Sequence, residues 1–314
     1  MSLYHGCDRT VGRQRVLQLR PDLEDCWERV DSLFPIRIAR PFWARATHGD
    51  DPLARQVLPD PRELEIDDSD LADPVGEEKN SPVPWVIRKH RDRLLLMITR
   101  RCHQHCRFCF RRRPAGSHSM DPTREEWERA LGYVEQSGVT EVILSGGDPL
   151  AVSDQRLFET LERLKQFTLR LHTRAPIAVP ERISPALVDG LRRSPVWVVV
   201  HVNHPREVDE AVSVALTRLV DAGIPLLQQT VLLRGVNDSV EVLAELCQKM
   251  VRLRVFPYYL HHADCARGMA HFRLSIREGR LLYEALRGRI SGVALPRYVI
   301  DLPDGTGKTD VNAV

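Results

Sequence analysis

The chain lacks an excess of charge of either sign, because its 314 residues include 45 Lys and Arg against 43 Asp and Glu, for a net charge of +2. This balance gives no electrostatic reason to expect a nucleic acid or an anionic membrane as a partner. The sequence also lacks any uninterrupted apolar run near the ~18 residues of a membrane span, and no signal sequence follows Met1. We therefore expect a cytoplasmic protein that binds neither membrane nor nucleic acid.

Cysteine is scarce, and most of it is isolated. Of the seven cysteines, Cys7, Cys26, Cys247 and Cys265 stand alone, so the second cysteine pair of a usual structural zinc site is missing. This irregular placement indicates a reducing compartment. The other three cysteines gather in one run, Cys102-His-Gln-His-Cys106-Arg-Phe-Cys109.

The CxxxCxxC run follows an apolar stretch, residues 94–99, that is typical of a buried parallel strand. Thiolates this close together bind metal. A zinc ion would need a fourth ligand, for which His103 and His105 are nearest in sequence. A cluster of four irons held by the three thiolates would instead leave one iron open for a substrate. The run favours the iron–sulfur cluster and leaves zinc as the alternative.

The chain changes character near Trp85. Residues 1–85 are rich in charge and proline, with one amphipathic helical stretch at 23–33, whereas apolar strand-like runs alternate with helical ones after Trp85. This alternation predicts an α/β fold, a partial (β/α)6 TIM-like barrel, at 86–296, after an irregular, partly helical segment at 1–85 and before a C-terminal segment at 297–314. The expected strands are 94–99, 141–144, 168–172, 196–202, 225–232 and 254–260, and the expected helices are 125–135, 155–165, 185–191, 208–220 and 240–250.

Polar residues follow every expected strand. Barrel enzymes place their chemistry at the carboxyl ends of the strands, so these residues should share one face. Each of them alone would be more simply read as a loop residue, but six strand ends in register predict an active site. They are the cysteine loop, Ser145-Gly146-Gly147-Asp148, Thr173-Arg174, His201 with Asn203, Gln228-Gln229, and His261-His262 with Asp264.

The cysteine run, with the aromatic Phe108 before its last cysteine, and the Gly-Gly-Asp after the second strand resemble the radical S-adenosylmethionine superfamily. The resemblance implies that S-adenosylmethionine binds the open iron and that a reductant such as flavodoxin or ferredoxin drives its cleavage to a 5'-deoxyadenosyl radical. Gly146 and Gly147 would let backbone groups approach this cofactor, and Asp148 or Ser145 would help to hold its ammonium group. The alternative for the glycine pair is an ordinary turn.

A closer resemblance, to the lysine 2,3-aminomutase family, covers most of the chain from Ser81 to Asp310. It implies a second cofactor, pyridoxal 5'-phosphate, which needs a lysine for its Schiff base. The matching segments are Ser81-Pro-Val-Pro84, Cys106-Arg-Phe-Cys109-Phe-Arg-Arg-Arg113, Leu144-Ser-Gly-Gly-Asp148, Asn203-His-Pro205, Val231-Leu-Leu-Arg-Gly-Val-Asn-Asp238, Pro257-Tyr-Tyr-Leu260, His271-Phe-Arg273, and Asp301 through Gly307-Lys308-Thr309.

The resemblance assigns residues to two parts of the pyridoxal phosphate, the carbon that forms the Schiff base and the phosphate. Lys308 matches the family's Schiff-base lysine, although a lysine this near the end of a chain would otherwise be read as a solvated tail charge. Arg93 matches a phosphate ligand, with Lys89 and His90 at neighbouring contact positions. Lysine at position 89 departs from the family and offers a point charge rather than a bidentate fork. The alternative for this Arg-Lys-His-Arg run is a solvated charge cluster.

The resemblance also assigns an amino acid substrate. Arg111 matches the guanidinium that clamps its carboxylate, and Asp264 and Asp301 match the carboxylates that hold the distal ammonium of lysine. His201 and Gln229 match positions near the adenosyl group. The implied activity is that of an isomerase that moves the amino group of L-lysine from C2 to C3 and gives β-lysine.

Several alternatives stay open from the sequence. The stretch 51–57 is also similar to the branch of the family whose (R)-β-lysine modifies elongation factor P. Another cationic amino acid, such as arginine, could replace lysine, because pocket depth cannot be read from sequence. A homo-oligomer is open as well. The alternative outside enzymes is a zinc or nucleic-acid-binding protein that uses the Cys/His run and Arg111–Arg113.

Overall fold

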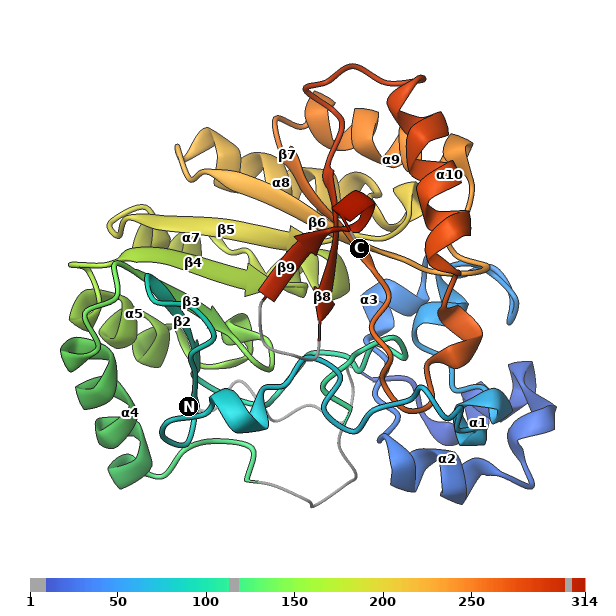
Figure 1. The fold of residues 1–314 in the computed structure, drawn as a ribbon, viewed down its shortest axis with the longest axis horizontal. Coiled ribbons are helices and arrows are strands. Elements are labelled where there is room, and N and C mark those ends of the chain that lie inside the picture. The colour runs from blue at the N-terminus through green and yellow to red at the C-terminus, as the bar shows by residue number, and fades with distance from the viewer. Residues whose placement is uncertain (1–9, 113–118, 303–306, 314) are drawn as a thin grey trace.

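The computed structural model describes residues 10–112, 119–302 and 307–313. Their centre is a curved sheet whose strands follow one another in chain order (Figure 1). β2 to β8 pair in parallel, and β1 and β9 add antiparallel edges. The strands are β1 (Val86–Ile87), β2 (Arg93–Met97), β3 (Glu141–Ser145), β4 (Thr168–Thr173), β5 (Val196–His201), β6 (Leu226–Leu232), β7 (Phe256–His262), β8 (Arg297–Leu302) and β9 (Gly307–Asp310). The predicted α/β partial barrel is confirmed, and β8 extends its parallel part.

Most of the long helices start at a residue whose side chain caps the first turn. Thr123, for example, accepts the backbone N–H of Glu126, whose own carboxylate accepts from the N–H of Thr123. The last long helix was missing from the prediction, although Ser275 and Glu278 form the same kind of capping box at its start. The helices are α1 (Arg13–Leu19), α2 (Trp27–Leu33), α3 (Arg40–Trp43), α4 (Arg124–Gln136), α5 (Asp154–Arg163), α6 (Ala175–Ala178), α7 (Pro185–Leu191), α8 (Glu210–Asp221), α9 (Val240–Arg252) and α10 (Ile276–Arg287).

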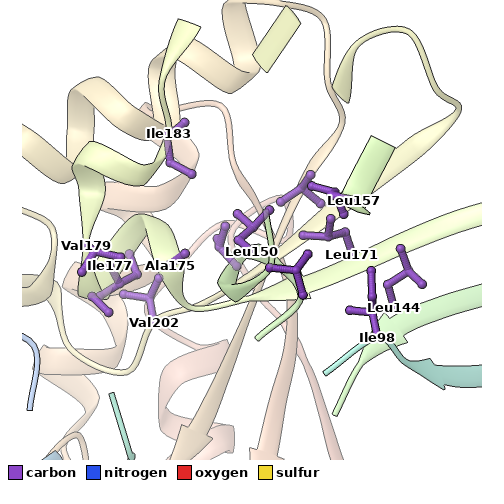
Figure 2. Packing of buried hydrophobic residues seen from close by; sticks show 14 of the residues in the cluster. Ile98, Leu144, Leu150, Leu157, Leu171, Ala175, Ile177, Val179, Ile183 and Val202 are labelled. Carbon is purple, nitrogen blue, oxygen red and sulfur yellow. The ribbon is translucent and has the colours of Figure 1, made fainter. Parts of the chain in front are cut away.

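The main core lies between the outer face of the sheet and the helices beside it. In Figure 1, α4 and α5 lie beside β2 and β3, and α8 and α9 lie beside β6 and β7. Figure 2 shows the packing, where Leu144 and Leu171 from neighbouring strands meet Leu157 of α5. Because side chains alternate along a strand, burying this face turns the other set of side chains, such as Arg170 and His172 of β4, toward the inner face of the curve.

The two edges of the sheet come close to each other. Lys89 follows β1, and its Nζ lies 3.1 Å from the Oδ1 of Asp301 on β8. Gly307 at the start of β9 has a φ of +88°, and a Cβ there would lie 2.4 Å from the ring of His90. Glycine is therefore required at this position. The contact brings the C-terminal strands against the first strand of the barrel.

The N-terminal segment is held to the barrel by a buried ion cluster. Glu63 is fully buried and accepts hydrogen bonds from the Nε of Arg107 at 2.9 Å and from Arg112. Burial raises the pKa of Glu63, but the charges of the two arginines outweigh it and hold the pKa below its usual value. Since Arg107 lies between Cys106 and Phe108, this cluster also fixes the cysteine loop. The division of the chain after residues 85 and 296 stays a prediction.

Replacing Glu63 by glutamine should destabilise the fold strongly, because it leaves two buried arginines without their counter-charge. We expect a loss of about 3–5 kcal/mol in the free energy of unfolding, measured by denaturant titration. The control is Glu125→Gln, which removes an exposed ion pair with Arg129 and should cost less than about 1 kcal/mol. Equal effects of the two substitutions would contradict the structural role of the buried cluster.

Among the residues that the structure describes, none of the helices is long and apolar enough to cross a membrane.

Candidate active site

The inner face of the curved sheet encloses one large cavity of about 1260 Å³. Pockets for a single small ligand usually measure about 300–1,000 Å³, so this cavity can hold more than one. The strands of the sheet, the cysteine loop and the N-terminal segment all contribute residues to its lining. Every residue to which the family resemblance assigns a role lines this cavity, whereas Asn203, Gln228 and His262 of the predicted strand ends are buried and do not line it. The assigned roles stay predictions.

The three predicted metal ligands, Cys102, Cys106 and Cys109, lie in the loop after β2 and line the cavity. Burial raises the pKa of each thiol, for Cys109 to about 11. The thiols are therefore neutral until a bound metal displaces their protons. In a cluster of four irons each thiolate binds a different iron, so the thiolates need not converge on one point. The donor set thus fits the iron–sulfur cluster.

The two histidines that could complete a zinc site point elsewhere. The Nε2 of His103 lies 3.3 Å from the carbonyl oxygen of Leu150, and the Nδ1 of His105 lies 2.8 Å from that of Pro35. Within the described ranges, no three His, Cys, Asp or Glu side chains converge as ligands of a single metal ion. The geometry therefore favours the cluster over the zinc alternative.

Arg174, at the end of β4, touches the cysteine loop, whereas the sequence marked it only as a polar strand-end residue without a role of its own. Its Nη1 donates to the Sγ of Cys106 at 2.8 Å, and its Nη2 donates to Gln56 at 2.7 Å and to Glu207 at 3.1 Å. Its charge opposes the effect of burial on the pKa of Cys106. A hydrogen bond of this kind stabilises negative charge on the sulfur. The only sequence signal was its position after a strand.

The Gly-Gly-Asp turn after β3 packs tightly against the cysteine loop. A Cβ on Gly146, whose φ is +108°, would lie 2.4 Å from the side chain of Met97, and one on Gly147 would lie 2.4 Å from the carbonyl oxygen of Arg101. Asp148 accepts from the Thr173 hydroxyl at 2.7 Å and from the backbone N–H groups of Leu150 and Arg174. Its carboxylate is thus engaged by the protein, whereas Ser145 beside it lines the cavity.

His201 and Gln229 sit side by side on β5 and β6, in register. The ring of His201 lies 5.3 Å from that of Phe108, and its Nε2 lies 3.0 Å from the Oδ1 of Asn203. Burial lowers the pKa of His201 well below its usual value, so the ring is neutral. His172 lies on β4, the strand between β3, which leads into the Gly-Gly-Asp turn, and β5, which carries His201. Its Nε2 is buried and has no hydrogen-bond partner in the described part of the chain.

Where β7, β8 and β9 line the cavity, carboxylates and lysines meet. Lys308 on β9 places its Nζ 3.2 Å from the Oδ2 of Asp301, while Lys89 donates to the Oδ1 of the same carboxylate. These two cations outweigh burial and hold the pKa of Asp301 below its usual value. Asp264 has no such ion pair with the residues that the structure describes. Burial, and then the charge of Asp301, raise the pKa of Asp264 to about 7.

The predicted phosphate-binding residues also line the cavity. They are Lys89, His90 and Arg93. In this structure Arg93 donates to Asp92 beside it, at 3.0 and 3.1 Å, and Lys89 pairs with Asp301. His90 lies against Gly307 at the start of β9, and Lys89 shares the carboxylate of Asp301 with Lys308.

Arg111 reaches the cavity from the cysteine loop and pairs with Glu77 of the N-terminal segment, at distances down to 2.5 Å. Burial lowers the pKa of Arg111, but the carboxylate of Glu77 outweighs it, so the guanidinium stays charged. Glu77 is a lining residue that the sequence reading missed, because nothing in its neighbourhood marks it. Arg113 and residues 303–306, which include Gly305, lie outside the described residues.

Comparison with known proteins gives consistent matches. The sequence profile of the radical SAM superfamily matches residues 96–247. An L-lysine 2,3-aminomutase of Clostridium subterminale is 42% identical over 267 residues, which are 83% of this chain and 64% of that protein. That of Fusobacterium nucleatum is 41% identical over 83% of this chain and 63% of its own length. That of Methanococcus maripaludis is 38% identical over 90% and 68%. The chain therefore spans about two thirds of the length of these relatives.

Proposed function

The chain belongs to the lysine 2,3-aminomutase family of radical SAM proteins, and from this premise we propose that it moves the amino group of L-lysine from C2 to C3 to give β-lysine. One observation carries the proposal. The three thiols, Lys308 and the acidic pair Asp264 and Asp301 line the same cavity, although they lie far apart in the sequence. This cavity has room for two cofactors and an amino acid.

The residues of the cavity fit two cofactors, each held by different elements of the lining. Cys102, Cys106 and Cys109 would hold a four-iron cluster whose open iron binds S-adenosylmethionine, beside the Gly-Gly-Asp turn and His201. Lys308 would hold pyridoxal 5'-phosphate, with its phosphate near the cations of the first strand. When bound, these groups supply a carbon radical that abstracts hydrogen and a carbonyl carbon that captures an amine. The protein positions the reacting atoms and keeps water out.

The charges of the cavity favour an amino acid with a second amino group. Arg111 would bind the carboxylate of the substrate, and Asp264 with Asp301 would bind its distal ammonium. Two carboxylates near each other repel unless a cation lies between them. Burial, and then the charge of Asp301, raise the pKa of Asp264, so a cation bound between the two carboxylates would favour its ionised form. A glutamate side chain would add a third negative charge and should be rejected.

The proposal is tested by product analysis after anaerobic reconstitution with iron, sulfide, pyridoxal phosphate, S-adenosylmethionine and a strong reductant. L-Lysine, L-arginine and L-glutamate are supplied in separate reactions. We expect β-lysine from lysine, no β-amino acid from glutamate, and no net consumption of S-adenosylmethionine. Absence of β-lysine, in a preparation that binds both cofactors and cleaves S-adenosylmethionine, would overturn the proposed substrate.

Lysine binding should depend on pH near neutrality because of Asp264. With a pKa of about 7, its carboxyl group is largely protonated at pH 6 and ionised at pH 8, whereas Asp301 stays ionised throughout. The affinity for lysine, relative to norleucine, which has no distal amine, should therefore rise about tenfold from pH 6 to pH 8. Spectroscopic titration of the bound pyridoxal phosphate measures both affinities. Asp264→Asn should flatten the profile, and a profile unchanged by this substitution would remove Asp264 from the substrate pocket.

A further inference from the structure

Glu77 is delivered to the cavity by a tightly bonded turn of the N-terminal segment. The carboxylate of Asp73 accepts the backbone N–H groups of Glu77 at 2.8 Å and of Glu78 at 2.9 Å. Gly76, with a φ of +67°, makes the bend, and its carbonyl oxygen accepts from the side chain of Asn80 at 2.6 Å. The turn holds Glu77 at a fixed place while its neighbour Glu78 faces solvent.

Glu77 occupies one edge of the guanidinium of Arg111. The Nε of Arg111 lies 3.0 and 2.8 Å from the two carboxylate oxygens, and its Nη2 lies 2.5 Å from the first of them. The side chains of Arg111 and Glu77 are only 17% and 11% exposed. The Phe110 ring supports the guanidinium from one face, with its centroid 4.5 Å from Cζ. Arg111 is thus fixed in position and orientation.

One end of the guanidinium is left for a ligand. The Nη1 of Arg111 has no hydrogen-bond partner in the part of the chain that the structure describes, and Arg111 lines the cavity. A guanidinium presents five N–H donors, so it can bind a second carboxylate at the end that Glu77 leaves open. An arginine fixed before binding loses less side-chain entropy when the ligand arrives.

We propose that Glu77 is the positioning residue for Arg111, which orients the open end of the guanidinium toward the carboxylate of the amino acid substrate. The inference rests on the proposed aminomutase function and adds a member from outside the barrel to its substrate site. It also gives Glu77 a role in binding, where the sequence indicated only an irregular segment. Glu77 acts through Arg111 and touches no reacting atom.

The test compares two ligands that differ only at the carboxylate. Dissociation constants of L-lysine and of L-lysinamide are measured from the absorbance of bound pyridoxal phosphate, without S-adenosylmethionine, so no radical chemistry is needed. Glu77→Gln should raise the constant for lysine about 10- to 100-fold and that for lysinamide less than about threefold. Glu77→Asp should restore part of the difference. The matched control is Glu78→Gln, which should change neither constant.

The outcomes separate the inference from the function on which it rests. An equal rise for both ligands in Glu77→Gln would mean a purely structural role, and no rise, or tighter lysine binding, would mean no positioning role or a competing one. Each of these results overturns the inference while leaving the aminomutase proposal intact. A wild-type protein that holds pyridoxal phosphate but binds neither ligand would overturn both.

Discussion

Replacing Lys308 by alanine is expected to abolish the covalent attachment of pyridoxal phosphate and to lower β-lysine formation at least about a thousandfold. Lys308 lies on the edge strand β9, and the requirement for glycine at position 307 brings it against His90 and the predicted phosphate region. Its amine donates to the Oδ2 of Asp301 at 3.2 Å. The visible absorbance of the bound cofactor measures the attachment, and iron and sulfide content should stay unchanged.

Lys308→Arg is the matched variant for this experiment, because it keeps a positive charge beside Asp301 but has no amine that can form the covalent bond. We expect it to lose the absorbance as completely as Lys308→Ala. If the arginine variant retained attachment and turnover, the charge of residue 308 would be its function and another lysine would hold the cofactor. Lys89 would then be the next residue to test, since it also lies against Asp301.

The sequence was most informative where function depends on local spacing. The cysteine run places three predicted ligands within eight residues, and the parallel strands were predictable because each is a short, largely apolar run. The six expected strands are all present, with ends shifted by a few residues. The family resemblance then supplied Lys308, Asp264 and Asp301, which no local pattern marks.

The sequence was least informative where a contact joins distant segments. Glu63, Glu77 and Arg174 are ordinary charged residues in the sequence, and their importance comes from partners 33 to 118 positions away. The expectation for Lys89 shows the same limit. As a single residue it was assigned to a phosphate, but the curve of the sheet also brings it to Asp301 of β8. Only the folded chain shows that one lysine can serve both regions.

Replacing Cys106 by alanine should have the opposite signature to the change at Lys308. We expect loss of most of the iron and sulfide and no detectable cleavage of S-adenosylmethionine, because two thiolates cannot complete the three-point attachment of the cluster. The absorbance of bound pyridoxal phosphate should persist, since Lys308 lies on β9 and Cys106 in the loop after β2. Cys106 is the most informative of the three ligands because Arg174 donates directly to its sulfur.

The control for the cysteine experiment is Cys265→Ala, which removes an exposed cysteine outside the run and should leave iron content and turnover unchanged. Iron and sulfide analysis and the electron paramagnetic resonance of the reduced protein provide the measurements. If Cys106→Ala lost both the iron and the pyridoxal phosphate, the two cofactor regions would depend on each other for folding. If it kept full iron and turnover, the cysteine run would not be the cluster site, and the proposed radical reaction would fail with it. If Cys106→Ala removed only the iron–sulfur cluster and Lys308→Ala only the pyridoxal phosphate, the protein would bind the two cofactors independently.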